Sequence, residues 1–137
     1  MSNLNKYDFV IYGATGFTGK LVVEYAINQY ESNNEISWAI AGRNNEKLEH
    51  VQEKYSLPSN IGKIVVDSND QNSIDEMVSQ TKCVLTTVGP YQLYGEKIVK
   101  TCISTGTDYV DLCGEPGFMH KIISECSVEA KETGARI

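Results

Sequence analysis

Residues 12–21, YGATGFTGKL, place three glycines three residues apart, at Gly13, Gly16 and Gly19. An apolar run, FVIY, precedes them and an amphipathic segment follows, so the loop joins a predicted strand to a predicted helix. In a nucleotide-binding βαβ unit, the first glycine permits the sharp turn, the second lets the backbone approach a pyrophosphate, and the third lets the helix pack closely. The spacing therefore predicts a dinucleotide-binding loop, with a glycine-rich turn that holds no ligand as the alternative.

A phosphate-binding P-loop is excluded by the same stretch. That motif needs four residues between its glycines, followed by Lys and then Ser or Thr. Here five residues separate Gly13 from Gly19, and Leu21, which cannot ligate magnesium, follows Lys20. We therefore expect Lys20 to be a solvated helix residue.

Apolar runs and segments of helical period alternate along the chain. This predicts an α/β fold, a Rossmann-type doubly wound parallel β-sheet of five to six strands with helices on both faces. The first helix is expected to turn Leu21, Val22, Tyr25 and Ala26 inward, and the last helix Phe118, Met119, Ile122, Ile123 and Cys126. The predicted strands cover 8–12, 36–41, 63–66, 83–88 and 109–112, and the predicted helices cover 17–30, 44–55, a short segment around Ile74, 95–105 and 116–133.

The length of 137 residues is that of one domain. Gly134 is a predicted helix stop, and residues 135–137 read as the opening of a sixth strand. We therefore expect residues 1–137 to be a single dinucleotide-binding domain, truncated before a second domain for substrate binding or dimerisation.

The composition excludes several classes of protein. A formal net charge of −6 argues against binding to a nucleic-acid backbone. The longest apolar runs are too short to span a membrane, and the start MSNLNKYD lacks the apolar core of a secretory signal. Four cysteines without a C-x-x-C pair and two scattered histidines predict no metal site and a cytoplasmic or other reducing intracellular compartment.

The end of the second predicted strand selects the dinucleotide. NAD sites place Asp or Glu there to bind the ribose 2′-hydroxyl, but this strand runs into Arg43. A guanidinium suits a 2′-phosphate, so NADP(H) is the predicted cofactor, with Asn44 and Lys47 as possible assistants. Asp67, at the end of the third strand, is a candidate for the adenine end of the cofactor, or an N-cap for the next turn.

Ligands of open α/β sheets lie beyond the carboxyl ends of the strands. The fourth strand ends near Gly89 and Pro90, which permit close backbone approach and force the chain out of the strand. Near the end of the fifth strand, Glu115 before Pro116 reads as a helix N-terminus. Asp111 and Glu115 could instead serve as acid and base. Catalytic residues are not identified, because no Tyr-x-x-x-Lys pair is present.

The set YGATGFTG, WAIAGRN, TTVGPYQLYGE and YVDLCGEP resembles the NADP-binding domain of saccharopine dehydrogenase-like oxidoreductases, a group that includes the mycobacterial trans-acting enoyl reductases. The resemblance covers nearly all of residues 7–137. It implies roles for three groups of residues: Gly13, Thr15, Gly16, Phe17 and Thr18 at the pyrophosphate, Arg43 at the 2′-phosphate, and Gly89, Pro90 and Tyr91 on the nicotinamide side. It also implies a second α/β domain that shapes the substrate site and often a homodimer.

The function expected from these features is that of the NADP(H)-binding domain of an oxidoreductase. The full-length protein would move hydride to or from an unidentified small molecule bound with the help of the missing domain, and this fragment alone would be inactive. The alternative is a non-catalytic NADP(H)-sensing or protein-interaction module. A domain that binds no nucleotide and associates through its open sheet edge is a further alternative.

Overall fold

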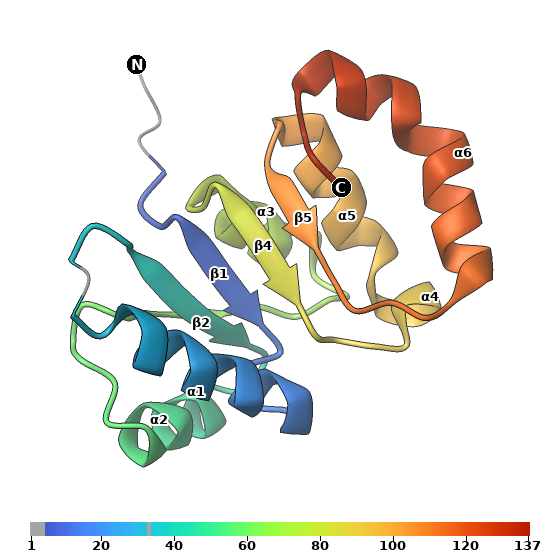
Figure 1. Cartoon of the computed structure of the whole chain (residues 1–137). Helices are drawn as coiled ribbons and strands as arrows, with labels where there is room; N and C mark the ends of the chain where they lie inside the picture. Colours follow the sequence, from blue (N-terminus) through green and yellow to red (C-terminus); the bar gives the residue numbers. More distant parts are fainter. Residues whose placement is uncertain (1–4, 33) are drawn as a thin grey trace.

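The computed structural model describes residues 5–32 and 34–137, which form one parallel sheet with helices on both faces (Figure 1). The strands lie in the order β3-β2-β1-β4-β5, and each pair of neighbours is parallel. Because the chain moves outward in one direction from β1 and then in the other from β4, the sheet is doubly wound. This confirms the predicted fold class. The strands are β1 (Phe9–Tyr12), β2 (Trp38–Gly42), β3 (Gly62–Val65), β4 (Cys83–Thr86) and β5 (Asp108–Val110).

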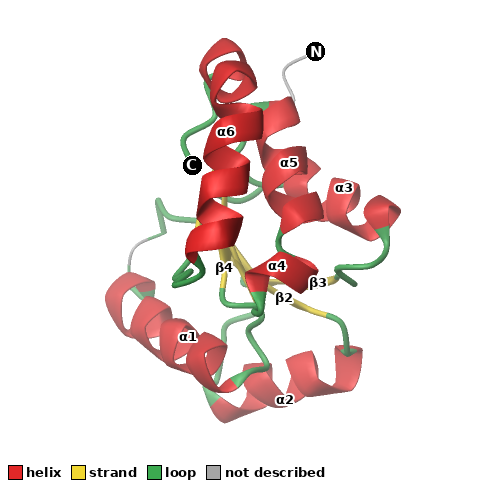
Figure 2. Ribbon diagram, turned by 90° about the vertical axis from the view of Figure 1, so that its right-hand side faces the viewer, coloured by secondary structure: helices red, strands yellow, loops and turns green. Residues whose placement is uncertain are grey.

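The helices divide between the two faces of the sheet. Figure 2 shows α1 and α2 on one side, and α3, α5 and α6 on the other. This division follows from right-handed crossovers, which place the helices of the two halves on opposite faces. The helices of the described residues are α1 (Phe17–Tyr30), α2 (Asn45–Lys54), α3 (Gln71–Ser79), α4 (Tyr91–Tyr94), α5 (Glu96–Thr105) and α6 (Pro116–Thr133).

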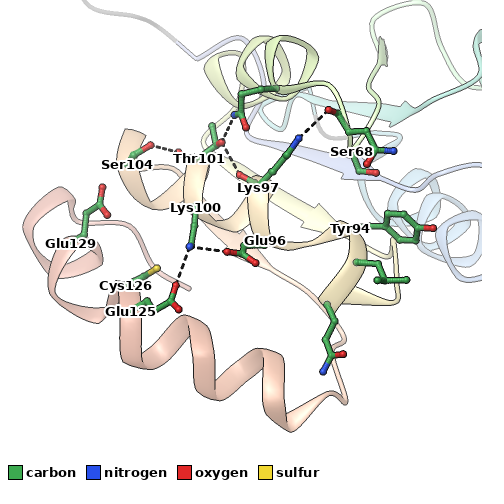
Figure 3. Close-up of a pocket in the computed structure, with 14 residues that line it drawn as sticks. Ser68, Tyr94, Glu96, Lys97, Lys100, Thr101, Ser104, Glu125, Cys126 and Glu129 are labelled. Atoms are coloured by element: carbon green, nitrogen blue, oxygen red, sulfur yellow. Dashed lines mark hydrogen bonds and ion pairs between the residues drawn. The ribbon is translucent and has the colours of Figure 1, made fainter.

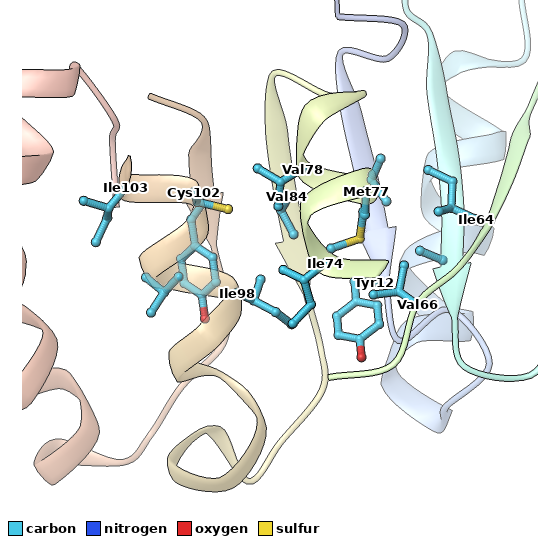
Figure 4. Close-up of a cluster of buried hydrophobic side chains, with 14 of the residues drawn as sticks. Tyr12, Ile64, Val66, Ile74, Met77, Val78, Val84, Ile98, Cys102 and Ile103 are labelled. Atoms are coloured by element: carbon cyan, nitrogen blue, oxygen red, sulfur yellow. The ribbon is translucent and has the colours of Figure 1, made fainter. Parts of the chain in front are cut away.

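Each face of the sheet has its own hydrophobic core. Alternate strand residues contribute to each, because successive side chains of a strand point to opposite faces. Tyr12 and Val84 join the core under α3, α5 and α6, part of which is drawn in Figure 4. Ile11 and Trp38 join the core under α1 and α2. Strands β1, β2 and β4 contribute to both cores, and this packing on two faces holds their ends in a fixed arrangement.

The predicted inner face of α1 is wrong in part. Leu21 and Tyr25 are exposed, whereas Val23, Ala26 and Ile27 are buried. The reason is Gly19, which must face the Gly13 carbonyl in the loop after β1 and so turns positions four and seven residues later inward. Leu21 lies about 200° further round the helix from Gly19 and therefore points outward.

The predicted inner face of α6 needs a similar correction. Phe118, Ile122 and Cys126 are buried at a spacing of four residues, but Met119 and Ile123 are exposed. The helix presents a narrower apolar stripe to α5 than its sequence suggests. The short helix α4 was not predicted, because its single turn is too short to show helical periodicity.

The predictions made for the two ends of the chain are not tested by the structure. Past Gly134 the chain returns beside β5, where the Tyr109 N–H donates to the Arg136 carbonyl at 2.9 Å. Residues 135–137 belong to no strand of the sheet, so the sixth strand and the second domain remain predictions. Residues 1–4, which contribute to the expected lack of a secretory signal, lie outside the described residues. Within the part that the structure describes, no helix has the length and apolar character needed to cross a membrane.

Candidate functional site

The loop after β1 requires glycine at its first position. Gly13 has φ +91°, a left-handed conformation that other residues adopt only with strain. A Cβ atom there would also lie 2.5 Å from Thr87 Oγ1 and 2.8 Å from Val88 Cγ2. The turn therefore brings the end of β1 against the end of β4, the neighbouring strand.

The third glycine sets how closely α1 approaches the loop. A Cβ atom on Gly19 would lie 1.9 Å from the Gly13 carbonyl oxygen, a distance that no side chain can take. Gly16 stands between them as the N-cap of α1 and is exposed, with only the Gly13 oxygen near its Cβ position, at 3.4 Å. The first turn of α1 has neither a side-chain cap nor an acidic residue. Its N–H groups and the positive end of the helix dipole thus offer an uncovered anion site.

A cavity of about 290 Å³ opens over this loop. It extends from the end of β2 to the end of β4, which is where open α/β sheets hold an extended dinucleotide. The glycine turn forms its middle, and no Asp, Glu, His or Lys of the described residues lines it. The lining residues are Tyr12, Gly13, Thr15, Gly16, Gly42, Arg43, Ser68, Thr87, Val88, Gly89 and Tyr94.

Arg43 lies at the β2 end of the cavity, as predicted. It directly follows Gly42, the last residue of β2, and is exposed. Among the ion pairs of the described residues, none involves Arg43, so its guanidinium is available to a ligand. The Asn44 side chain instead caps α2 by accepting from the Lys47 N–H at 3.0 Å, which leaves only its amide NH₂ group for a cofactor.

The end of β3 contributes Ser68 to the cavity rather than Asp67. The Asp67 carboxylate accepts from the Asn69 N–H at 2.8 Å, and Asp70 is the N-cap of α3. Asp67 thus caps the turn that follows β3, as its alternative role predicted, while Asp70 caps the helix itself. A place for Asp67 at the adenine end of the cofactor stays a prediction. Nearby, burial raises the pKa of the Tyr12 hydroxyl above its usual 10.0, although Ser68 acts in the opposite direction, so Tyr12 is a neutral donor at the cavity wall.

The end of β4 reaches the cavity through Thr87, Val88 and Gly89. The Gly89–Pro90 peptide is cis, and the Tyr91 side chain turns away into the core. The Tyr91 hydroxyl donates to the Thr86 carbonyl at 3.2 Å and accepts from the Leu112 N–H at 3.4 Å. Tyr91 thus joins the ends of β4 and β5, and its ring is not part of the cavity.

Phe17 and Thr18, the other two loop residues predicted to bind, are both exposed and do not line the cavity. Phe17 is 85% exposed, which leaves its ring outside the fold. Their backbone N–H groups belong to the first turn of α1, so any contact with a pyrophosphate would come from the backbone.

Glu115 occupies the predicted helix start but acts on a different helix. It is the N-cap of α6, with Pro116 in the first turn, yet its carboxylate does not cap α6. Instead it accepts from the Tyr91 N–H at 2.6 Å and the Gln92 N–H at 3.2 Å, which caps α4. Both oxygens are thus engaged away from the cavity.

Asp111, the other carboxylate considered as an acid or base, is held by its neighbours. It accepts from the Tyr109 hydroxyl at 2.7 Å and from the Cys113 N–H at 2.9 Å. Burial, together with the bond to Asp111, raises the pKa of the Tyr109 hydroxyl. Asp111 does not line the cavity, so the geometry brings no acid–base pair to the cofactor position.

A larger hollow of about 720 Å³ lies between α5 and α6 (Figure 3). It meets the glycine-loop cavity at Ser68 and Tyr94, which line both. Its charges pair with one another: Lys100 Nζ lies 2.8 Å from Glu96 and 3.0 Å from Glu125. The lining also carries Lys97, which donates to the Asn69 carbonyl, and Glu129, so its carboxylates outnumber its ammonium groups. The smaller cavity, with its uncovered N–H groups and Arg43, is therefore better suited to an anion.

Comparison with known proteins decides the family. Residues 9–136 match the saccharopine dehydrogenase NADP-binding domain. The chain belongs to this family. The match confirms both the resemblance read from the sequence and NADP as the class of cofactor.

Relatives of the family share this region at substantial identity. A lipid droplet localized protein of Caenorhabditis elegans is 43% identical over 98% of this chain and 32% of its own length. A saccharopine dehydrogenase-like oxidoreductase of Mus musculus is 41% identical over 96% of this chain and 33% of its own length. A protein of Mycobacterium tuberculosis named a trans-acting enoyl reductase is 38% identical. The chain therefore spans about a third of the length of these relatives.

Solved structures agree with the family at the level of the fold. The yeast methylglyoxal/isovaleraldehyde reductase in complex with NADPH matches 93% of this chain and 51% of its own, with a TM-score of 0.68 and 16% identity. Saccharopine dehydrogenase of Saccharomyces cerevisiae matches 85% of this chain and 24% of its own, with a TM-score of 0.66 and 18% identity. Family membership thus comes from the sequence, and these structures establish the Rossmann-type arrangement.

Proposed function

We propose that this domain binds NADP(H) along the cavity over its glycine loop, for hydride transfer by the longer protein. The pyrophosphate would lie over Gly16 and the first turn of α1, and the 2′-phosphate at Arg43. The observation that supports this most directly is Arg43 at the end of β2, where an NAD site carries a carboxylate; it forms no ion pair with any residue that the structure describes.

The uncovered start of α1 supports the same assignment. At Gly16 there is open space beside the free N–H groups of the first turn. At Gly13 and Gly19, by contrast, a Cβ atom would clash with neighbouring atoms, so only glycine fits. A pyrophosphate fits such a cradle because it needs close backbone approach and the positive end of a helix dipole. Bound NADP(H) supplies or accepts the hydride. The domain's own residues would bind and orient it.

The proton donor and the substrate pocket are proposed to come from a second domain of the longer protein. Within residues 5–32 and 34–137, no carboxylate, histidine or lysine lines the cavity. Asp111 and Glu115 accept hydrogen bonds from Tyr109 and Tyr91 outside it. The substrate is proposed to be a small molecule that accepts or donates hydride at a C=O, C=N or C=C bond, and the longer protein to be a homodimer. The four free cysteines suit a reducing compartment, and the acidic charge argues against nucleic acid as a partner.

Calorimetric titration with NADPH and NADH tests the cofactor assignment. We expect clear preference for NADPH, and an Arg43→Ala variant should bind NADPH about ten- to a hundredfold more weakly, as for a lost charge-assisted bond to phosphate. Lys131→Ala is the matched control, since it removes an exposed positive charge on α6, outside the cavity. Equal affinity for both nucleotides in the wild type would overturn the proposal.

Measuring NADPH oxidation by the longer protein distinguishes an enzyme from a sensing module. A longer protein that binds NADPH but never oxidises it in the presence of carbonyl, imine or enoyl compounds would favour a sensing module. The lack of an acid–base pair at this cavity is the observation that keeps that alternative in view.

A further inference from the structure

A second cavity of about 290 Å³ lies between α1 and α2, beside the cofactor cavity. Thr15 lines both cavities and lies against Gly42, where a Cβ atom would stand 3.5 Å from Thr15 Cγ2. The two hollows therefore meet over Thr15 at the end of β2. The second cavity is lined by Thr15, Lys20, Lys47, His50, Val51 and Lys54.

The positive charge of this cavity is not neutralised by the protein. Among the described residues, no ion pair involves Lys20, Lys47 or Lys54, whereas Lys63, Lys82, Lys100 and Lys121 all pair with carboxylates. Together with Arg43, these make four cations without an ion pair among the described residues, near one end of the cofactor cavity in a chain of net charge −6. Because positive charges this close together repel one another, binding of an anion between them would be favourable.

Two of these lysines occupy positions that do not help their helices. Lys20 follows the first three residues of α1, and Lys47 is the third residue of α2, so each ammonium group lies near the positive end of a helix dipole. Lys54 differs, because it ends α2, where a cation is favourable, and it lies 5.2 Å from the centre of the Tyr55 ring. Helix stability therefore does not explain why lysines stand at these two positions. Lys20 lies in α1, as predicted, and is partly exposed.

We infer that Lys20 and Lys47 form a second wall of the 2′-phosphate site, opposite Arg43. The phosphate would lie over Thr15, with the Thr15 hydroxyl as a further donor and the two ammonium groups on the α1–α2 side. This rests on the proposed binding of NADP(H) and deepens it: selectivity for the 2′-phosphate comes from three cations on separate elements, and Arg43 alone accounts for only part of it. A phosphate dianion suits three donors of this kind, whereas the ribose hydroxyl of NADH does not require them.

The test compares NADPH and NADH affinities in Lys20→Gln, Lys47→Gln and the double variant. Each single change should weaken NADPH binding about five- to tenfold, as for a partly solvated charge-assisted bond. NADH affinity should stay within about twofold, because the removed groups face only the 2′-phosphate. Lys131→Gln serves as a control of equal charge change, on an exposed site of α6 outside both cavities.

Two further measurements sharpen the result. Preference for 2′,5′-ADP over 5′-AMP should fall in the double variant, which places the effect at the 2′-phosphate. Urea unfolding should show the variants to be as stable as the wild type or slightly more so, because a cation near a helix start has been removed. A loss of affinity through misfolding would lower stability instead.

The outcomes separate this inference from the proposed function. If Arg43→Ala loses NADPH preference but the double lysine variant keeps it, the second wall is refuted and NADP(H) binding stands. If inorganic phosphate occupies the lysine cavity without competing with NADPH, the cavity is an independent anion site and the inference is again refuted. If the wild type does not prefer NADPH, the proposed function and the second wall fall together.

Discussion

Gly19 brings the first turn of α1 against the Gly13 carbonyl, and that approach decides which face of the helix is buried. Because a Cβ atom at Gly19 would lie 1.9 Å from this oxygen, any side chain there must push the helix away from the loop. Val23 and Ala26 then lose part of their contact with the sheet. The same residue therefore shapes both the start of α1 at the glycine loop and the core beneath it.

Gly19→Ala should consequently lower the free energy of unfolding by about 1–3 kcal/mol, the range for overpacked sites. Gly114→Ala is the matched control, since nothing lies within 4 Å of its Cβ position. That variant should be neutral or slightly stabilising, because alanine restricts the unfolded chain. Urea denaturation of both proteins measures the difference. A Gly19→Ala protein as stable as the control would contradict the contact.

Glu115 shows that a single carboxylate can organise an element far from its own position in sequence. Its oxygens accept from the Tyr91 and Gln92 N–H groups, which start a helix of only four residues. So short a helix cannot persist without such a cap. At the scale of elements, α6 thereby positions α4 beside the cavity, where Tyr94 forms part of the lining.

Glu115→Gln should loosen α4 while leaving the sheet intact. We expect faster hydrogen exchange at the Tyr91 and Gln92 amides and a loss of about 1 kcal/mol in overall stability. Glu129→Gln, on the exposed part of α6, is the control and should leave exchange unchanged. Protection of the two amides that is the same in all three proteins would show that another group caps α4.

The contact between α5 and α6 should depend on pH through Glu96. Hydrogen bonds from Lys100 and Lys121 hold the pKa of the Glu96 carboxyl below its usual 4.5. A carboxyl with a lowered folded-state pKa stabilises the protein above the unfolded pKa and loses that contribution as the pH falls through the folded value. Solvent screening limits the contribution to about 1 kcal/mol, since these pairs are partly exposed.

Glu96→Gln should therefore be less stable than the wild type at pH 7, by up to about 1 kcal/mol. The difference between the two proteins should shrink as the pH falls below 4.5 and the wild-type carboxyl takes up its proton. Denaturation curves at pH 7, 5 and 3.5 measure this trend. A difference that persists unchanged at low pH would assign it to packing.

At the scale of the molecule, one sheet separates two cores and couples them. Trp38, the single tryptophan, is buried under α1 and α2, while Ile98 is buried on the other face among α3, α5 and α6. Strands β1 and β4 contribute side chains to both faces. Loss of either core should thus unfold the whole domain.

Ile98→Ala should cost about 2–4 kcal/mol, since it empties a fully buried site. Although Ile98 lies on the opposite face, the unfolding transition seen by Trp38 fluorescence should shift as far as the one seen by circular dichroism. Leu48→Ala, in the Trp38 core, is the comparison. Separate transitions for the two probes would show that the two faces unfold independently.

Sequence alone determined the class of fold, the family and the place of the glycine-rich loop between β1 and α1. Apolar alternation and helical period are local properties, so the strands and most helices follow directly from them. The glycine loop follows the first strand and Arg43 follows the second. Because neighbouring parallel strands end at the same edge of a sheet, their closeness can be predicted from the sequence. The inner faces of α1 and α6 were predicted less well, because two neighbouring stripes of each helix are apolar.

Only the tertiary structure decided which polar groups are free to act. Glu115 and Asp111 looked like candidate acids and bases, yet hydrogen bonds to α4 and to Tyr109 occupy them. Ser68 and Thr87 reach the cavity because β3 and β4 end on either side of Tyr12, and Lys20 meets Lys47 because α1 and α2 cover the same face. These residues are far apart in sequence and come together because of the order of the strands. A local sequence pattern does not predict that order.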